Sequence, residues 1–237
     1  MCRYRFQLRK VLTCVEHREI KIDVTNINQK VYEILKRRII TLVYLPGHKL
    51  NVLKIRQELG VSQSPIMDAL FRLAGENMVE ISSRRGTYVK EITELDIREI
   101  AAVRIMLEVG AVEIIAEHIT DEQIGELRRL YNETLIQGPE FDYDLYMEKD
   151  KAFHLAIIRF TGNRRLISMY DQLNAHMQIV RFRFARQSKT KLSWTDEDHQ
   201  NILNTLQGRN PEKAKETIRN HLLRARDAFL QNERQAL

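Results

Sequence analysis

Cysteine is almost absent from this chain of 237 residues, and long apolar runs are lacking altogether. The two cysteines, Cys2 and Cys14, both lie near the N-terminus, so they form neither a disulfide framework nor a thiolate metal site. No apolar run approaches the roughly 18 residues of a membrane span. The first twenty residues are basic, but they lack the apolar segment and the small-residue cleavage site of a secretory signal. We therefore expect a cytoplasmic protein that does not contact a membrane.

The sequence also lacks the patterns of common catalytic sites. It contains no nucleophile elbow and no glycine-rich phosphate loop, and no motif identifies a general base. Internal repeats and low-complexity stretches are missing as well. We therefore expect no catalytic residues and a function other than that of an enzyme.

What is present is a marked charge asymmetry. Residues 1–92 carry 17 Lys and Arg against 9 Asp and Glu, a net charge of +8, whereas residues 93–237 carry 21 against 23, a net charge of −2. Hydrophobic residues make up 43% of the chain and charged residues 30%, which is typical of a soluble globular protein. A basic front joined to a near-neutral back predicts a polyanion-binding module with a second domain, the alternative being a solvated charged face.

The basic front has the pattern of three helices followed by a hairpin. Apolar spacing predicts one helix from Asn28 up to the Pro46-Gly47 turn and a short second helix over about 52–59. Ser64 is a suitable N-cap for a third helix, because Pro65 then lies in its first turn. Two short strands and a basic tip follow, at about 78–82 and 87–92 with Ser83-Arg84-Arg85-Gly86 between them.

This order predicts a winged helix-turn-helix domain over residues 27–92, preceded by a basic arm over residues 1–26. The third helix is narrow enough to enter a major groove, and the hairpin tip can contact phosphates. A packed helical corner with a capping hairpin is the alternative interpretation. The arm could add phosphate contacts through Arg3, Arg5, Arg9 and Lys10. The predicted DNA contacts of the domain itself are Ser62, Gln63, Ser64, Met67, Arg72, Arg84, Arg85 and Gly86.

Residues 93–237 have an almost wholly helical pattern. Strong breaks occur at Gly162-Asn163 and at Gly208-Arg209-Asn210-Pro211, where Asn210 can cap a helix that starts with Pro211. The predicted helices span about 94–118, 121–137, 142–161, 164–187, 196–207 and 211–232. We therefore predict a mainly α protein in which the winged helix-turn-helix is followed by a bundle of six or seven helices.

One carboxylate and three imidazoles point into this predicted bundle. Asp150 and His154 are four residues apart on one apolar helix face, and His199 and His221 each lie in the apolar stripe of another helix. Burying these groups together without a partner is costly, and a divalent cation would satisfy all four. Hydrogen-bonded core histidines are the alternative for each residue taken singly. Three nitrogens and one oxygen suit zinc, nickel, manganese or iron and do not choose among them.

Two further polar residues accompany apolar stripes of the bundle. Arg104 is placed to close a pocket and bind a carboxylate, although a surface position fits its spacing equally well. His176 falls on an apolar stripe of the fourth predicted bundle helix and could line the same pocket. Both are predicted effector-binding residues.

These residues resemble a known family. The segments PGHKL at 46–50 and LGVSQSPIMDALFRL at 59–73 resemble the DNA-binding signature of the GntR family of bacterial transcription regulators, and RGTYV at 85–89 resembles its wing. Downstream motifs resemble the FadR-type branch with an FCD effector domain: RIMLE at 104–108, DKAFH at 150–154, TGN at 161–163, DH at 198–199 and NHL at 220–222. The resemblance covers about residues 27–232, and it identifies residues 93–237 as the FCD-type domain.

The resemblance implies a homodimer that binds a pseudo-palindromic operator on double-stranded DNA. It also implies that the helical domain binds a small carboxylic acid near a metal, with Arg104 in the effector pocket. Asp150, His154, His199 and His221 match the metal-binding positions of the branch. We therefore predict a regulator, by family tendency a repressor, in which the bound acid changes the angle between the domains. Three alternatives remain open: a metal sensor, a purely structural metal, and a metal-dependent hydrolase or lyase with a DNA-binding domain.

The recognition helix departs from the family pattern at two positions. The family usually has arginines in the turn and the first helical turn, where this chain has Gln63 and Met67. Bidentate arginine–guanine contacts are therefore not available at these positions. Because Gln63 can bind adenine and Met67 can contact a thymine methyl group, we expect an A·T-weighted operator.

Overall fold

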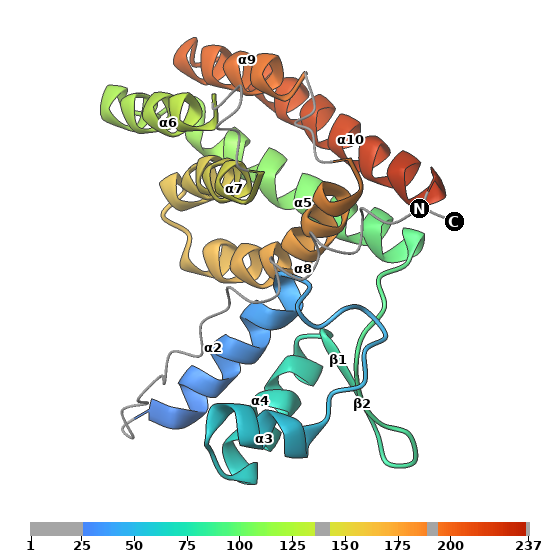
Figure 1. The fold of residues 1–237 in the computed structure, drawn as a ribbon. Coiled ribbons are helices and arrows are strands. Elements are labelled where there is room, and N and C mark those ends of the chain that lie inside the picture. Colours follow the sequence, from blue (N-terminus) through green and yellow to red (C-terminus); the bar gives the residue numbers. More distant parts are fainter. Residues whose placement is uncertain (1–25, 136–142, 189–193, 236–237) are drawn as a thin grey trace.

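The computed structural model describes residues 26–135, 143–188 and 194–235, so the predicted basic arm lies outside the described residues except for Asn26. The described chain begins with three helices and a two-stranded antiparallel sheet (Figure 1), as predicted: α2 (Ile27–Ile40), α3 (Val52–Leu59), α4 (Gln63–Gly75), β1 (Val79–Ser82) and β2 (Gly86–Val89). The buried side chains of α4 pack against those of α2 in one core, which includes Val31, Leu35, Ile39, Ile66, Leu70 and Leu73. This is a winged helix-turn-helix.

The recognition helix α4 starts two residues earlier than predicted. Its N-cap is Ser62, with extended backbone, and the helix begins at Gln63, so Ser64 lies inside the first turn. Pro65 is tolerated there because the first N–H groups of a helix have no intrahelical acceptor. Gly60 ends α3 with φ at 63°, as the sequence predicted. The loop between α3 and α4 is therefore short and places Ser62, Gln63 and Ser64 at an exposed corner.

The wing is held together by backbone pairing and by one glycine. In its register Val79 pairs with Val89 and Ser82 with Gly86, so Ser83, Arg84 and Arg85 form the tip. Gly86 has φ at 102°, which glycine adopts without strain. The second strand ends at Val89, three residues before the predicted end, and the chain then leads to the helical domain.

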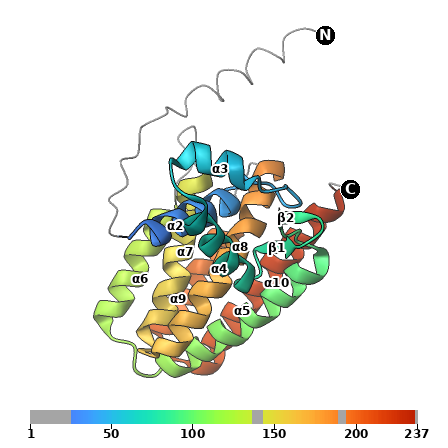
Figure 2. The same cartoon turned by 90° about the horizontal axis from the view of Figure 1, so that it is seen from below.

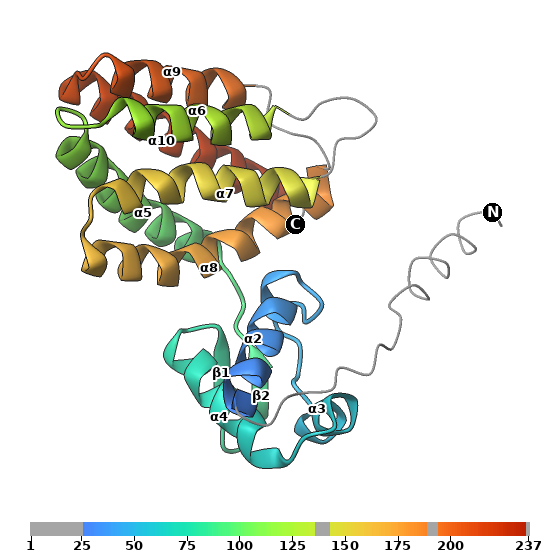
Figure 3. The same ribbon diagram turned by 90° about the vertical axis from the view of Figure 1, so that its left-hand side faces the viewer.

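The rest of the described chain forms six helices, as the sequence predicted: α5 (Glu94–Ile115), α6 (Asp121–Thr134), α7 (Tyr143–Phe160), α8 (Arg164–Ser188), α9 (Thr195–Gln207) and α10 (Pro211–Gln235). Capping boxes begin α5 at Thr93 and α6 at Thr120. The helices lie side by side in a bundle (Figure 2), and α8 is the bundle helix next to the winged domain in Figures 1 and 3. None of the helices in the described part of the chain is long and apolar enough to cross a membrane.

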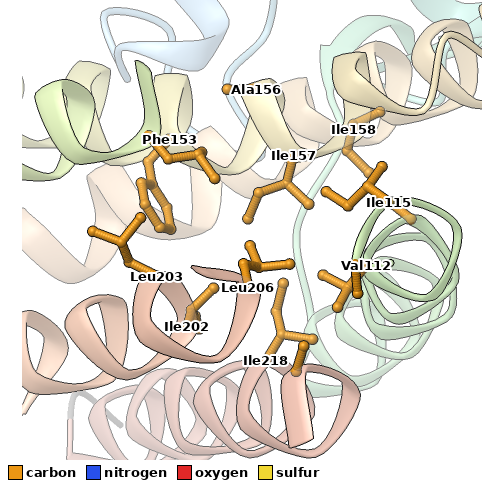
Figure 4. Close-up of a cluster of buried hydrophobic side chains, with 14 of the residues drawn as sticks. Val112, Ile115, Phe153, Ala156, Ile157, Ile158, Ile202, Leu203, Leu206 and Ile218 are labelled. Atoms are coloured by element: carbon orange, nitrogen blue, oxygen red, sulfur yellow. The ribbon is translucent and has the colours of Figure 1, made fainter. Parts of the chain in front are cut away.

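The bundle core fixes the positions of the three histidines that the sequence singled out. Figure 4 shows apolar side chains of α5, α7, α9 and α10 meeting in one cluster, among them Phe153, Ile202 and Ile218. Phe153 precedes His154 in the chain, and Ile202 and Ile218 lie one turn from His199 and His221. Because these neighbours are completely buried, the imidazoles are directed into the same interior.

Candidate metal centre and nucleic-acid interface

His154, His199 and His221 form a buried cluster between three helices, α7, α9 and α10. One ring nitrogen of each lies within 4.8 Å of the others. The Nε2 atoms of His154 and His221 are 3.3 Å apart, and Nε2 of His199 lies 3.3 Å from Oδ1 of Asp150. The same carboxylate oxygen is 3.9 Å from Nε2 of His154. The structure therefore brings together all four residues that the sequence predicted as metal ligands.

Two carboxylates hold the outer nitrogens of two of these rings. Nδ1 of His154 lies 2.7 Å from Oε2 of Glu108 on α5, and Nδ1 of His221 lies 3.3 Å from Oδ2 of Asp198 on α9. A carboxylate accepts a hydrogen bond and so favours the tautomer that carries its proton on Nδ1. Nε2 of each ring is then left with a lone pair directed into the cluster.

Each of these carboxylates is itself held in place. Oε1 of Glu108 accepts hydrogen bonds from Nε of Arg104 at 2.5 Å and from the hydroxyl of Tyr170 at 2.8 Å. Oδ1 of Asp198 accepts one from Nη1 of Arg224 at 2.6 Å. Such outer partners orient imidazole ligands in metal sites.

The charge states of the cluster follow from burial and from its cations. Burial alone would raise the pKa of Glu108, but Arg104 and His154 outweigh it and hold the pKa well below its ordinary value. Burial opposes ionisation of Asp150 in the same way, and Arg181 with the neighbouring histidines reverses the shift. Burial and then the neighbouring rings lower the pKa of His199 and of His221. Both carboxylates are therefore ionised at neutral pH and these two imidazoles are neutral, the form that binds metals.

The donor set fits a divalent cation better than it fits a network without one. Neither ring nitrogen of His199 has a hydrogen-bond partner among the described residues, although the side chain is completely buried. A buried polar group without a partner costs about 1–3 kcal/mol. The facing lone pairs of His154 and His221 repel each other as well. A cation bound by the three Nε2 atoms and by Asp150 would remove this repulsion and would give Nε2 of His199 a partner.

The two predicted effector-binding residues lie in different places. Arg104 is only 3% exposed and contacts the outer side of the cluster through Glu108, which excludes the surface position that its spacing also allowed. His176 contacts the winged domain instead: its Nε2 lies 2.8 Å from the backbone oxygen of Glu76. The structure thus does not bring His176 to the pocket beside the histidines.

That pocket is small. A cavity of about 40 Å³ lies next to the cluster and is lined by Asp150, Arg181 and His221 together with Tyr146, Met147, Trp194, Thr195, Ala225 and Phe229. Because one water needs roughly 10–15 Å³, it holds about three waters as it stands. Its lining combines charged and polar side chains with aromatic and aliphatic ones.

The predicted DNA contacts lie on two exposed parts of the winged domain. Ser62, Gln63 and Ser64 are exposed at the start of α4, and Arg84 and Arg85 are exposed at the wing tip. Met67 is half-buried. Gly86 contributes its positive φ to the turn of the wing. Arg72 is exposed but directed to α2, with its guanidinium 3.8 Å from the ring centre of Tyr32 and donating to Gln29 at 3.1 Å. Arg72 could contact DNA only if its contacts with Tyr32 and Gln29 were broken.

Several residues of these sites were not predicted from the sequence, among them Arg181, Glu108 and Phe71. Arg181 on α8 places Nη1 2.5 Å from Oδ2 of Asp150, and Glu108 holds His154. The four-residue spacing of Arg104 and Glu108 was the one signal that could have indicated the second of them. Phe71 is 59% exposed on α4, two helical turns beyond Gln63 and one beyond Met67. An exposed phenylalanine on a recognition helix is a further candidate for contact with DNA.

The fold joins a winged helix-turn-helix, the class of domain that binds DNA, to a separate helical domain with a buried histidine cluster. Residues 27–89 match the model of "Bacterial regulatory proteins, gntR family", and residues 99–224, more than half of the chain, match the FCD domain. The chain therefore belongs to the GntR family of bacterial regulatory proteins with an FCD domain, and it is a DNA-binding transcriptional regulator.

Individual relatives agree with this assignment. The chain is 27% identical over 195 residues to the uncharacterized HTH-type transcriptional regulator YdhC of Bacillus subtilis, covering 80% of this chain and 85% of YdhC. It is 25% identical over 197 residues to the HTH-type transcriptional repressor RspR of Escherichia coli, covering 83% and 86%. The solved structure of E. coli McbR/YncC shares the fold, with a TM-score of 0.74 at 22% identity over 86% of this chain and 97% of that chain.

Proposed function

We propose that a divalent metal in the helical bundle, together with a small acid bound beside it, controls the affinity of the winged domain for its operator. The observation that carries this proposal is the pair of Nε2 atoms of His154 and His221, which face each other at 3.3 Å while carboxylates hold their Nδ1 atoms. Asp150, His154, His199 and His221 would hold the metal. When bound, a divalent cation supplies a positive charge that can attract an anionic ligand.

The acid would bind in the cavity next to the cluster. Arg181 is the arginine that lines this cavity, so it would bind the carboxylate of the acid. Arg104 would contribute indirectly, because it holds Glu108, which in turn holds His154. With a volume of about 40 Å³, the cavity admits an acid of two or three carbons without much movement of its walls. Ligand and operator would then change each other's affinity by the same factor.

The small cavity also favours a second candidate, in which the cation itself is the signal. A regulator of this kind needs a metal site and no room for an organic ligand. The two candidates differ in one measurable respect. Under the first, an acid changes the operator affinity of the metal-loaded protein, and under the second the metal alone gives the full change.

We further propose that the chain acts as a homodimer on a pseudo-palindromic operator. Helix α5 carries an exposed apolar face formed by Val103, Met106, Gly110 and Ile114, at three-, four- and four-residue spacing. Val103, Met106 and Ile114 are 41%, 73% and 52% exposed, and a side chain at Gly110 would meet no atom within 4 Å. A second copy of α5 would cover this face. Light scattering should show that Met106→Glu lowers the molecular mass to that of a monomer. Met169→Glu, which changes an exposed methionine of α8, should leave the mass unchanged.

Operator binding of the full-length protein tests metal control directly. Duplexes selected by the protein from a random DNA pool would be titrated in chelator and then with Zn²⁺, Ni²⁺, Mn²⁺ or Fe²⁺, and the affinity read by fluorescence anisotropy. We expect at least one metal to change operator affinity by about 5- to 150-fold. His154→Ala should abolish this change and leave the affinity in chelator intact, and His118→Ala, an exposed histidine outside the cluster, should behave as wild type.

Two outcomes would contradict the proposal. One is an operator affinity that no metal changes in the wild-type protein, whether or not small carboxylic acids are present. The other is a folded His154→Ala variant that has lost operator affinity in chelator as well, because the cluster would then support DNA binding and not sense a ligand. Small carboxylic acids added to the metal-loaded protein then decide between an acid and the cation as the signal.

A further inference from the structure

Helix α8 packs against the winged domain with one of its faces. Ala175 and Ile179 are buried in the core of that domain, and Phe182 packs against the same core. Nη1 of Arg183 donates a hydrogen bond of 2.8 Å to the backbone oxygen of Ile92, in the segment that joins the two domains. This face therefore has both apolar and polar contacts with the DNA-binding half of the chain.

The other faces of α8 belong to the bundle and to the histidine cluster. Arg181 pairs with Asp150, and the Tyr170 hydroxyl donates to Glu108, which holds His154. Met177 and Val180 pack in a bundle core that includes Phe229 of α10. One helix thus contacts the metal centre on one side and the winged domain on the other.

His176 connects α8 to the recognition helix itself. Its Nε2 lies 2.8 Å from the backbone oxygen of Glu76, and Glu76 is the C-cap residue of α4. The last carbonyl groups of a helix have no intrahelical donor, and the N–H group of His176 satisfies one of them here. The Glu76 carboxylate is bonded to Tyr32 and Lys36 of α2, so this end of α4 is anchored on both sides.

The spacing along α8 links this bond to the cluster. His176 and Arg181 are five residues apart, which corresponds to about 7.5 Å along a helix. Neighbouring turns of a helix move together, because each turn is hydrogen-bonded to the next. A shift of Arg181 relative to Asp150 therefore moves the donor that holds the C-terminal end of α4.

We infer that His176 is a positioning residue, which transmits the state of the histidine cluster to the recognition helix through its hydrogen bond to the backbone of Glu76. This inference rests on the proposed function, because it requires that the cluster controls operator affinity. It goes beyond that function in assigning the control to one interdomain bond. It also gives His176 a role at the domain boundary in place of one in the effector pocket.

Two variants at this position separate positioning from simple structural support. His176→Gln keeps an amide N–H that can reach the Glu76 oxygen, whereas His176→Leu keeps the bulk and removes the donor. For each full-length variant and the wild type, operator affinity would be measured in chelator and with saturating Zn²⁺. The quantity compared is the ratio of the two dissociation constants. Zn²⁺ affinity, measured by competition with a chelating dye, shows whether the cluster itself is intact.

We expect His176→Leu to bring the ratio close to 1 while Zn²⁺ affinity stays as in the wild type, and His176→Gln to retain most of the ratio. A His176→Leu variant with the wild-type ratio overturns the inference and leaves the proposed function standing. A wild-type ratio of 1 with each of Zn²⁺, Ni²⁺, Mn²⁺ and Fe²⁺, in the presence and in the absence of small carboxylic acids, overturns both. If His176→Leu does not fold, His176→Asn, whose amide is too short to reach Glu76, takes its place with the same expected results.

Discussion

Asp150 and Arg181 form an ion pair that closes one side of the histidine cluster. Nη1 of Arg181 lies 2.5 Å from Oδ2 of Asp150, and the two side chains are 7% and 6% exposed. The contact is electrostatic and lacks the angles of a hydrogen bond. The other oxygen of Asp150 is directed to His199 and His154. The guanidinium therefore compensates the charge of a residue that is also a candidate metal ligand.

Removal of this guanidinium should destabilise the metal-free protein. In Arg181→Met the buried Asp150 carboxylate loses its main cation, and breaking a buried pair on one side costs about 3–5 kcal/mol. We expect urea denaturation in chelator to show a loss of this size in the free energy of unfolding. A saturating divalent metal should recover part of it, since the cation would compensate the same carboxylate. An Arg181→Met variant as stable as wild type in chelator would contradict this account.

The wing tip should contribute to affinity through phosphate contacts. Arg84 and Arg85 are exposed beside the recognition helix, and each phosphate contact adds about one to the slope of log affinity against log salt. We expect Arg84→Ala and Arg85→Ala each to lower this slope by about 1 and to weaken binding similarly on all sequences. Arg209→Ala, between α9 and α10 of the bundle, is the matched control. An unchanged slope in both wing variants would show that the tip does not contact the DNA backbone.

Operator sequence should reflect the neutral outer face of α4. Gln63 is exposed at its start, Met67 follows one turn later and Phe71 is 59% exposed after another. A glutamine side chain pairs with adenine, and apolar side chains contact the thymine methyl group. Selection from a random DNA pool should therefore give half-sites rich in A·T at the positions under α4. Met67→Arg should add a preference for guanine at one position, and a G·C-rich core bound by the wild type would contradict the hypothesis.

The sequence predicted the histidine cluster because each ligand lies in the apolar stripe of its own helix. His199 and His221 have apolar neighbours at three- and four-residue spacing, and the stripe faces the only core available to a helix with one buried side. His176 has the same kind of spacing, but α8 is buried on two sides, against the bundle and against the winged domain. Periodicity alone does not tell which of the two cores a residue faces, so the sequence did not show that His176 faces the winged domain.

The residues on other helices that pair with these ligands could not be predicted from the sequence, for a related reason. Glu108 and Arg181 sit among apolar residues of long helices, where a charged residue fits either a solvated edge or a buried pair. Only the packing of α5 and α8 against α7 decides between these positions. The helix cap at Ser62 is a smaller example, since Ser62 and Ser64 are both good caps and the backbone of the turn selects the first.

Acidification should weaken the contact between the two domains through His176. Burial is the main cause that lowers the pKa of His176, and Lys90 and Lys36 lower it further, whereas the backbone and carboxylate of Glu76 raise it. The acidic side chains of Glu91, Asp96 and Glu99 line the same cavity between the domains. The folded protein thus favours the neutral ring, while the unfolded chain has the ordinary pKa of about 6.5. As pH falls through this value the unfolded state takes up the proton first, so the free energy of unfolding decreases until the folded-state pKa is passed.

The same substitution that tests positioning isolates this effect. His176→Gln removes the titrating ring and keeps a donor for Glu76, and the other histidines contribute equally to both proteins. In chelator, urea denaturation at pH 7.5 and at pH 5.5 should therefore show a larger loss of stability for the wild type than for His176→Gln. Equal losses would mean that protonation of His176 is no more costly in the folded than in the unfolded chain, and that its surroundings, including Asp96 and Glu76, compensate the charge fully.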